Sequence, residues 1–496
     1  MDSNSNNNDD NRVKMFFFPY IAGGHLLPMI DLAKFFASSH PLVDATVITT
    51  PKTAALFQSS SASPIPNFSF LTLELPKNDN DEDNDENFLS TMSADQRAKV
   101  LASFKNLKEP LQKLLFDLKP HCFVSDLLHS WTIELAQNAG VPWVVFHSTC
   151  LFVLCVEDYL ARFKPHRKGG LDSDMFLLSG LKDDSVRFNK LRLPVWHRGD
   201  EIPEAFLPIN LIRKACSRSY AMVVNSSFEF EGEFRERVQN AVGAPRVSMV
   251  GPVSLNSARN VSDAKVENVK SDIILKWLNL NQPGSVVYVS FGSEANLCKG
   301  QFHEIAHGLE SSGQPFIWVV RPNLFKAQGD EGWFPEGFES RVRDSNQGLI
   351  IKEWAPQLVI LGHVSLGAFV THCGWNSVLE GLSNGVPMIT WPLTHDQFYV
   401  ESLIVDVLKV GLRVGNEEWV DIIWPPKVAV TRDQVETAVR QMMGGRDEVE
   451  EMRRNVKEYA NKCKMSVQEG GSSYEDVCAL VEELKAHRNE LSQKLV

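Results

Sequence analysis

The chain has 496 residues, which exceeds what one hydrophobic core usually serves, so we expect two domains. With 43% apolar and 23% charged residues, it has the composition of a soluble globular protein. The formal net charge of −12, without any run rich in lysine and arginine, argues against nucleic acid and anionic membrane surfaces as partners.

The eight cysteines are scattered without a Cys-x-x-Cys pair, a pattern that favours reduced, buried thiols over a zinc site or a disulfide framework. The N-terminus is polar and acidic before a short MFFF run, so it lacks the basic leader and the long apolar stretch of a secretory signal. No segment reaches membrane-spanning length. We therefore expect a cytoplasmic protein without membrane insertion.

Short apolar runs alternate with amphipathic stretches through the first half of the chain, which is the βαβα rhythm of a parallel sheet in an α/β protein. The predicted strands are VKMFFFP, ATVITT, HCFVSD and VPWVVFH, and the predicted helices are Leu27 to Ser39 and Trp131 to Ala139.

His25 follows the first predicted strand on a loop bordered by Gly23 and Gly24, and Pro28 suits the first turn of the next helix. This places the imidazole at the carboxyl end of a strand, where open α/β sheets bind ligands. A structural histidine is the alternative, but a glycine-bordered loop has little core to fill. We expect His25 to act as a base, since an unperturbed pKa of about 6.5 suits that role near neutrality.

Asp126 ends the strand HCFVSD, so it is expected at the same edge of the sheet as His25. A carboxylate beside an imidazole fixes the tautomer of the ring and stabilises its protonated form. Asp126 could equally be the N-cap of the segment that begins near Leu127. Both interpretations stay open at this point.

An acidic stretch, 78–87, superficially offers calcium ligands, because Asp79, Asp81 and Asp83 alternate as in an EF-hand loop. The sixth position is Asn84 instead of glycine and the twelfth is Ser90 instead of glutamate, so we interpret the stretch as a solvated loop.

The triplets Asp81-Glu82-Asp83 and Asp172-Ser173-Asp174 match the Asp-x-Asp pattern of metal-dependent sugar transferases, but both lie in polar segments away from any apolar strand. We expect no metal site.

After a polar linker, 256–271, the α/β rhythm restarts and predicts a second sheet. Its predicted strands are SVVYVSFGS, PFIWVVR, GLIIKEW, GAFVTH and VPMITWP, with helices at Gln301 to Ser311, Asn376 to Ser383 and Gln397 to Val410. A last segment, Tyr474 to Leu495, has helical apolar spacing and is expected to pack on one of the domains.

Two turns of this second half are suited to a diphosphate. Ser293 follows one strand in a Phe-Gly-Ser turn, and His372 follows another. Asn376 and Ser377 come where the next helix begins and its N–H groups are unpaired. Glu380 lies one helical turn after Asn376, where its carboxylate can bind ribose hydroxyls.

The two ends of the segment from Trp354 to Gln397 complete a nucleotide-sugar site. Trp354 can cover a nucleobase, and Asp396 with Gln397 can bind sugar hydroxyls. A purely structural interpretation of the tryptophans explains Trp391 but not Trp354 or Trp375, which polar residues surround in the sequence.

The same segment, which begins WAPQ and ends DQ, resembles the signature box of the plant secondary-product UDP-glycosyltransferases, family 1 enzymes of the GT-B fold. The Gly-His pair, VSD before Trp131, VVFHST, VVNSSFEFE, GPVSL and VVYVSFGS are also similar to that family, so the resemblance covers essentially the whole chain.

The resemblance implies two Rossmann-like domains whose parallel sheets face a central cleft. Residues 1–255 would hold the acceptor, 256–271 would be a linker, 272–471 would hold the UDP-sugar, and a C-terminal helix at 472–496 would pack back toward the first domain. The family expectation for the oligomeric state is a monomer.

The resemblance also assigns roles to the candidate residues. It makes His25 the base and Asp126 its partner. For the donor it implies uracil contacts from Trp354 and the Ala355 backbone, ribose contacts from Gln357 and Glu380, diphosphate contacts from Ser293, His372, Asn376 and Ser377, and sugar contacts from Trp375, Asp396 and Gln397. The implied reaction is inverting. It uses a UDP-sugar as its donor substrate and needs no cofactor and no metal.

For the donor, Gln397 favours UDP-glucose, since His at this place often accompanies UDP-galactose in the family. His395 departs from the small residue usual two places earlier, which keeps galactose and pentoses open. The acceptor class implied is a flavonoid, a triterpenoid or steroidal saponin, or a phenolic compound, although the acidic stretch 78–87 replaces a Gly- and Pro-containing loop of the similar sequences.

Two other functions remain as alternatives. A dinucleotide-dependent oxidoreductase would need Gly-x-Gly-x-x-Gly after a strand, and the sequence from Ala22 to Leu27, AGGHLL, does not supply it. An inactive UDP-sugar-binding relative would be expected to have lost His25 or Asp126, and both are present.

Overall fold

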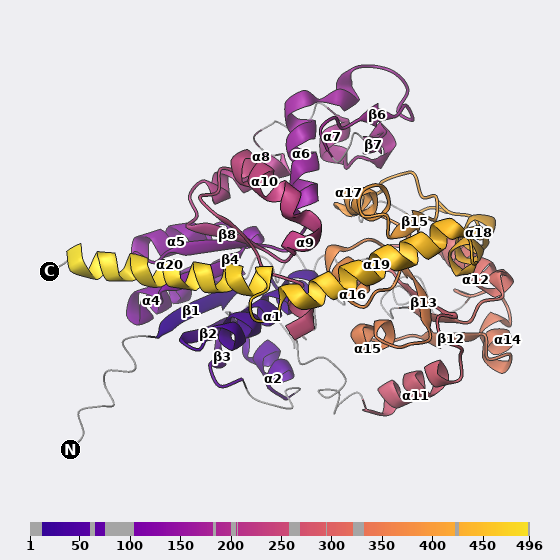
Figure 1. Ribbon diagram of the computed structural model, residues 1–496, viewed down its shortest axis with the longest axis horizontal. Helices are drawn as coiled ribbons and strands as arrows, with labels where there is room; N and C mark the ends of the chain where they lie inside the picture. The colour runs from indigo at the N-terminus through magenta and orange to yellow at the C-terminus, as the bar shows by residue number, and fades with distance from the viewer. Residues whose placement is uncertain are drawn as a thin grey trace. The chain divides into compact units, whose positions relative to one another are not determined.

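The computed structural model describes residues 12–59, 65–74, 104–181, 185–199, 205, 207–256, 268–293, 295–320, 332–421 and 426–494. The acidic stretch 78–87, with its Asp81-Glu82-Asp83 triplet, and most of the predicted linker lie outside these residues. The chain forms two compact units (Figure 1). The first takes Met1–Leu151, Ile209–Asp263 and Lys464–Val496, and the second takes Phe152–Pro208 and Ala264–Cys463.

The first unit contains a seven-stranded parallel sheet in the order β3-β2-β1-β4-β5-β8-β9. Its strands are β1 (Val13–Phe18), β2 (Val43–Thr49), β3 (Phe68–Thr72), β4 (Cys122–Asp126), β5 (Trp143–His147), β8 (Ala221–Val224) and β9 (Val247–Met249). The four apolar runs predicted as strands are β1, β2, β4 and β5. β4 and β5 are buried throughout, and most residues of β1 and β2 are buried, as in a parallel sheet covered on both faces.

Helices cover this sheet. They are α1 (Gly23–Ser39), α2 (Pro51–Ser59), α4 (Lys108–Leu118), α5 (Thr132–Ala139), α8 (Pro208–Cys216), α9 (Phe228–Glu231), α10 (Arg235–Val242) and α20 (Ser472–Lys494). Met15 and Phe17 of β1 share one core with α1 and with Val477, Leu480, Val481 and Leu484 of α20. Phe18, which alternates to the other face, packs near Phe123 and Phe104. The apolar spacing of the last segment therefore becomes a buried stripe on α20.

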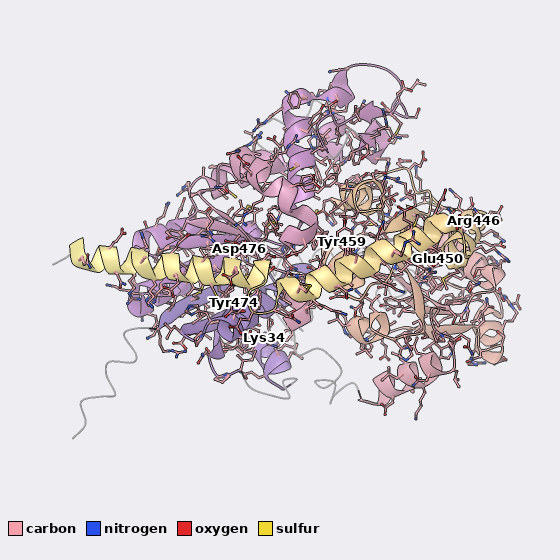
Figure 2. The ribbon with its side chains drawn as sticks, viewed as in Figure 1. Lys34, Arg446, Glu450, Tyr459, Tyr474 and Asp476 are labelled. Atoms are coloured by element: carbon pink, nitrogen blue, oxygen red, sulfur yellow. The ribbon has the colours of Figure 1, made fainter. Side chains whose placement is uncertain are left out.

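Polar contacts also fix α20 to this unit. Asp476, labelled in Figure 2, accepts a hydrogen bond of 2.9 Å from Arg235 and one of 2.7 Å from the backbone N–H of Met249. A carboxylate that accepts both a guanidinium and a main-chain donor sets the position of its helix along the sheet.

The start of α1 differs from the prediction. The helix begins at Gly23, four residues before Leu27, because the carbonyl of Ala22 already accepts the N–H of Leu26 at 2.8 Å. His25 therefore lies in the first turn of a helix and not on a loop, and Pro28 lies inside the helix. Apolar periodicity could not show this, because Gly23, Gly24 and His25 add nothing to the apolar stripe.

The second unit contains a six-stranded parallel sheet in the order β12-β11-β10-β13-β14-β15. Its strands are β10 (Val286–Ser290), β11 (Phe316–Val319), β12 (Gly348–Ile351), β13 (Leu366–Thr371), β14 (Met388–Thr390) and β15 (Gly411–Arg413). Its helices include α11 (Asn268–Asn279), α12 (Lys299–Ser312), α14 (Phe338–Asp344), α15 (Gln357–Leu361), α16 (Trp375–Ser383), α17 (Gln397–Ser402), α18 (Arg432–Met443) and α19 (Asp447–Ser466), whose last residues belong to the first unit. The α/β class is thus confirmed in both halves.

Residues 152–208 pack with the second unit although they precede it in sequence. They hold most of α6 (Leu151–Phe163), the short antiparallel pair β6 (Phe176–Leu177) and β7 (Arg187–Phe188), and α7 (Val195–Arg198). Compact packing units need not coincide with domains, so the predicted boundaries at 255, 271 and 471 stay predictions.

The described helices include none that is both long and apolar enough to cross a membrane. All eight cysteines are free thiols, and only Cys298 and Cys478 are partly exposed, which confirms the expectation of mostly buried thiols.

Candidate active site

His25 and Asp126 form a hydrogen-bonded pair at one edge of the first sheet. β1 and β4 are neighbours in register, with Phe18 opposite Ser125, so the residues that follow both strands emerge together. His25 Nδ1 lies 2.8 Å from Asp126 Oδ2. The imidazole is 27% exposed, while the carboxylate is 1% exposed. The predicted pairing of the two residues is therefore present in the geometry.

Asp126 fills both roles that the sequence left open. Its Oδ1 accepts the backbone N–H of Leu128 at 2.9 Å and so caps the short 3-10 helix Leu127–His129. Its Oδ2 is the atom that faces His25. Burial alone would raise the pKa of Asp126, but the charge and hydrogen bond of His25 and the Leu128 N–H outweigh it, so the pKa lies below its usual value.

This ionisation decides the tautomer of His25. A carboxylate can only accept hydrogen bonds, so Nδ1 of His25 must carry the hydrogen that lies between the two groups. In the neutral ring the lone pair that can accept a proton is then on Nε2. The arrangement is that of a general base oriented by a buried carboxylate.

Ser148 is a third member of this group that the sequence pattern did not single out. Its Oγ lies 3.1 Å from His25 Nδ1, where it can accept a share of the same hydrogen. The signal available was its place directly after β5, the strand beside β4. Tyr20 contacts the other side of the ring, edge to face, with centroids 5.5 Å apart.

Two neighbouring histidines are unsuited to the role of base. Burial lowers the pKa of both His129 and His147 to about 4, even though the charge of Asp126 opposes the shift. Their side chains are almost inaccessible, at 3% and 8% exposure. Of these three neighbouring histidines, only His25 combines the contact with Asp126 and an accessible ring.

In the second unit, one network joins the residues expected to bind ribose. Gln357, the first residue of α15, donates from Nε2 to Glu380 Oε2 at 2.7 Å and to Ser377 Oγ at 3.1 Å. Tyr288 of β10 donates to Gln357 Oε1 at 3.1 Å. The buried tyrosine fixes the glutamine, and the glutamine orients the carboxylate of Glu380, so three predicted donor residues lie together.

The two turns expected to bind diphosphate also lie together. Ser290 and Thr371 are paired at the ends of β10 and β13, so Ser293 and His372 follow neighbouring strands. Gly292 has φ +72°, and a Cβ there would lie 2.5 Å from the His372 ring. A Cβ on Gly374 would lie 2.4 Å from the same ring. The two glycines therefore leave just enough space for the imidazole and fix its plane.

Helix α16 starts directly after this ring, with Gly374 as its N-cap, so Asn376 and Ser377 lie in its first turn. The N–H groups of a helix's first turn have no partner within the helix, and with the positive end of the helix dipole they are suited to an anion.

Of the three tryptophans in this segment, one is exposed and two are buried. Trp354 is 50% exposed, as a base-stacking surface must be, and the adjacent Ala355 is buried. Trp391, at 1% exposure, is a core residue as expected, but Trp375 is also buried, at 4%. The sugar contact predicted for Trp375 stays a prediction.

The sugar end of the segment is a tightly held turn. Gln397 Oε1 accepts the backbone N–H groups of Leu393 and Thr394 at 2.8 and 3.0 Å. The amide oxygen is thereby held by the main chain, so the NH₂ group is the end that could donate to a ligand. His395 has an exposed side chain and φ +53°, and Asp396 is the N-cap of α17.

Asp172 and Asp174 are exposed, and Asp172 pairs with Lys190 at 3.1 Å. This agrees with the interpretation of that triplet as solvated charge. The expectation of a metal-free reaction stays a prediction.

Comparisons with known proteins agree with this geometry. The family model described as UDP-glucoronosyl and UDP-glucosyl transferase matches residues 246–407. Abscisate beta-glucosyltransferase of Phaseolus angularis is 39% identical, covering 96% of this chain and 97% of that protein. Soyasapogenol B glucuronide galactosyltransferase of Glycine max is 35% identical, covering 95% and 96%. The crystal structure of Glycyrrhiza uralensis UGT73P12 with glycyrrhetinic acid 3-O-monoglucuronide has a TM-score of 0.90, with 34% identity over 98% of both chains.

The close approach of Gly292 to His372 gives a testable prediction. Gly292→Ala should weaken UDP binding at least tenfold, because the new methyl group must displace the imidazole. Gly313→Ala is the matched control, since Gly313 has φ +70° but no atom within 4 Å of an added Cβ. Calorimetric titration with UDP should show loss for the first variant only. Equal affinities in both variants would contradict the role of the His372 ring.

The buried histidines predict a pH dependence of stability. His147 takes a proton near pH 6.5 when unfolded but only near pH 4 when folded, so stability is full above about pH 6.5 and falls toward pH 4. The loss per histidine is about 1 kcal/mol per pH unit in the middle of that range. In His147→Asn, an amide can still accept the Thr149 N–H, and urea unfolding at pH 7 and pH 5 should show a smaller difference than in the wild type. An unchanged difference would show that His147 does not titrate in this way.

Proposed function

The chain belongs to the plant UDP-glycosyltransferases of family 1, and from that premise we propose that it is an inverting enzyme that transfers glucose from UDP-glucose to a hydroxyl group of a small lipophilic plant metabolite. The two parallel α/β sheets fit the GT-B fold of that family. The observation that carries the catalytic proposal is the His25–Asp126 pair, because an inactive sugar-binding relative would have no need to keep a buried carboxylate on an accessible imidazole.

The proton transfer begins at His25. Nε2 accepts the proton of the acceptor hydroxyl while that oxygen attacks the anomeric carbon of the sugar. The ring becomes an imidazolium, and the ionised Asp126 stabilises its charge through Nδ1–H. The bond from the anomeric carbon to the diphosphate breaks on the opposite face, so an α-linked donor gives a β-glycoside and UDP.

The leaving diphosphate gains negative charge as this bond breaks. We assign its stabilisation to Ser293, His372, Asn376, Ser377 and the N-terminal N–H groups of α16. Trp354 and the Ala355 backbone would hold uracil, and Gln357 with Glu380 would hold ribose. Fixed donors at the start of a helix can take the place of a cation, so no metal and no cofactor is needed.

Glucose is the proposed sugar because the NH₂ group of Gln397 and the carboxylate of Asp396 can together donate to and accept from neighbouring hydroxyls. Galactose is the second candidate. It is favoured by the Glycine max relative named for galactosyl transfer and by the exposed His395 in a position next to Asp396. A UDP-pentose remains a further alternative.

For the acceptor, the similar structure with bound glycyrrhetinic acid 3-O-monoglucuronide and the soyasapogenol-named relative support a triterpenoid or steroidal compound. Flavonoids and simpler phenolics are the other proposed classes. We place the reaction in the cytoplasm and expect a monomer, with the acceptor held mainly by the proposed N-terminal domain, 1–255.

Product analysis tests the function directly. The purified protein is incubated with UDP-glucose, UDP-galactose or UDP-xylose and a pool of flavonoid, triterpenoid, steroid and phenolic acceptors, without added metal. Mass spectrometry should show a hexose added from UDP-glucose to one acceptor class, with UDP released in equal amount. Binding of UDP without any product from any donor would favour the inactive relative.

The dyad predicts a specific pattern among variants. His25→Ala should reduce transfer by roughly 10²- to 10⁴-fold, the usual contribution of a general base, without changing UDP affinity. Asp126→Asn can still cap Leu128 through its amide oxygen but presents NH₂ to His25, which selects the wrong tautomer and should also reduce kcat. Because the two residues act as one unit, the double variant should be no worse than His25→Ala. Additive losses in steady-state kinetics would contradict this mechanism.

A further inference from the structure

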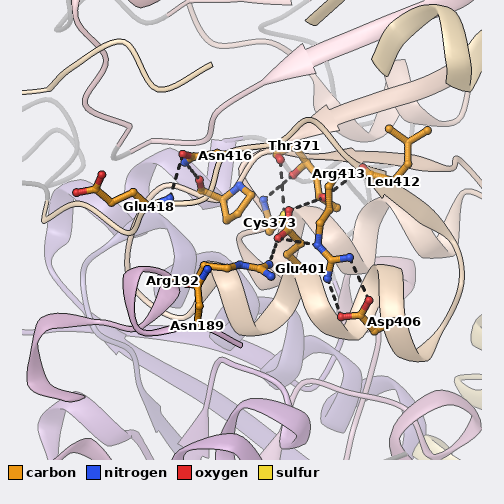
Figure 3. Close-up of polar contacts among 12 residues, drawn as sticks. Asn189, Arg192, Thr371, Cys373, Glu401, Asp406, Leu412, Arg413, Asn416 and Glu418 are labelled. Atoms are coloured by element: carbon orange, nitrogen blue, oxygen red, sulfur yellow. Dashed lines mark hydrogen bonds and ion pairs between the residues drawn. The ribbon is translucent and has the colours of Figure 1, made fainter. Parts of the chain in front are cut away.

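Helix α17 carries the sugar-directed residues at its start and a buried carboxylate one turn later. Glu401 comes four residues after Gln397 and is fully buried. Its Oε1 accepts Thr390 Oγ1 of β14 at 2.8 Å, and its Oε2 accepts Arg413 Nε of β15 at 3.2 Å (Figure 3). Glu401 therefore ties α17 to the ends of two strands.

A third tie comes from outside the sheet. Arg192, in the segment 152–208, forms an ion pair with Glu401 Oε2, and its side chain is only 8% exposed. Figure 3 shows Arg192 and Arg413 reaching the same carboxylate from different sides. Arg413 also pairs with Asp406 at 2.6 and 3.0 Å, so its positive charge is shared between two carboxylates. The ion pair described for Arg192 is with Glu401.

Aromatic contacts fix the guanidinium of Arg192 between two elements. Its Cζ lies 5.4 Å from the ring centroid of Phe188 and 5.6 Å from that of Phe398, which follows Gln397. Phe188 also packs edge to face on Tyr399, with centroids 5.5 Å apart. Phe398, Tyr399 and Glu401 of α17 thus all contact the short segment Phe188–Arg192.

The same segment reaches the turn in front of α17. The backbone N–H of Trp419 donates to Leu191 O at 2.9 Å, and its indole Nε1 donates to His395 O, also at 2.9 Å. One tryptophan therefore links Leu191 to the residue that precedes Asp396. Phe188–Arg192 is therefore linked to His395, which precedes Asp396 and Gln397, and to Phe398, which follows them.

We propose that Arg192 is a positioning residue for the donor sugar: through Glu401 and Phe398 it fixes the first turn of α17, and with it the direction of the Gln397 NH₂ group. This inference rests on the proposed function, since Gln397 has this role only if a UDP-sugar binds. On this proposal, a residue of the segment 152–208 affects the binding of the sugar but not the binding of uracil or ribose.

A purely stabilising role for Arg192 predicts something different. A loosened α17 would then lower thermal stability and the amount of active enzyme but leave the preference for one sugar unchanged. The ratio of affinities for UDP-glucose and UDP separates the two roles, because both ligands share every contact except those of the sugar.

The experiment compares Arg192→Met with Arg341→Met as a matched control. Arg341 makes a two-point ion pair with Glu310 in the same unit, at 2.7 and 2.9 Å, but it is exposed and belongs to no contact of α17. Calorimetry should show UDP affinity within twofold of the wild type for both variants. For Arg192→Met, affinity for UDP-glucose and the kcat/KM ratio of UDP-glucose to UDP-galactose should each fall about tenfold, as for the loss of roughly one hydrogen bond.

Further variants keep the result decisive. If Arg192→Met does not fold, the double variant Arg192→Met/Glu401→Gln removes both buried charges together and should show the same selective loss. Arg192→Lys should restore UDP-glucose affinity only in part, since lysine cannot span Glu401 and both rings as a planar guanidinium does. Unchanged sugar affinity and selectivity with a lowered melting temperature would overturn the proposal. The affinities for UDP and UDP-glucose are read without turnover. A wild type that binds UDP-glucose but forms no product would therefore refute the proposed function and leave the binding measurements of this test intact.

Discussion

The position at which strand order reverses determines where this protein can do chemistry. In the first sheet the order turns between β1 and β4, and in the second it turns between β10 and β13. Connections that follow two neighbouring strands leave toward opposite faces at such a point, so the strand ends between them stay open to a ligand. His25 follows β1 and Asp126 is the last residue of β4. Ser293 follows β10 and His372 follows β13. The chemistry of both units depends on this property of parallel sheets.

A second feature recurs among the candidate site residues: in Asp126 and Gln357, one end of the side chain is held by the protein. One oxygen of Asp126 caps a helix while the other faces His25. The oxygen of the Gln357 amide receives Tyr288, and its nitrogen holds Glu380. Such side chains lose little conformational freedom when a ligand arrives, so they can act without reorganisation. The rigidity of these side chains thus comes from hydrogen bonds within the protein.

Much of this could be predicted from the sequence because it is local. Apolar runs such as VVYVS predict buried strands, and residues directly after them, such as Asp126 and His372, must lie at the sheet edge. The start of α1 could not be predicted in this way, because its first turn has no apolar stripe.

Contacts that join distant segments are not specified by apolar periodicity either, although the place of Ser148 directly after β5 was an available signal. Ser148 reaches His25 from a third strand, and Arg192 reaches Glu401 across 209 positions of sequence. Nothing in the spacing of Trp375 showed that its ring is buried while that of Trp354 is exposed. These features are set by how elements pack, which periodicity does not encode.

The committed oxygen of Gln397 has a consequence for how such a site changes over generations. In the role proposed for Gln397, a residue at this place accepts from the main chain at one end and donates to the ligand at the other. Glutamine does so with its amide, and histidine can do so with Nδ1 accepting and Nε2–H donating. An ionised glutamate can accept but cannot donate, and leucine can do neither. Codons for glutamine and histidine differ by a single nucleotide. A lineage can therefore exchange one for the other in one mutational step while the turn stays folded, so the sugar preference of such a protein is open to rapid divergence even where its nucleotide site is fixed.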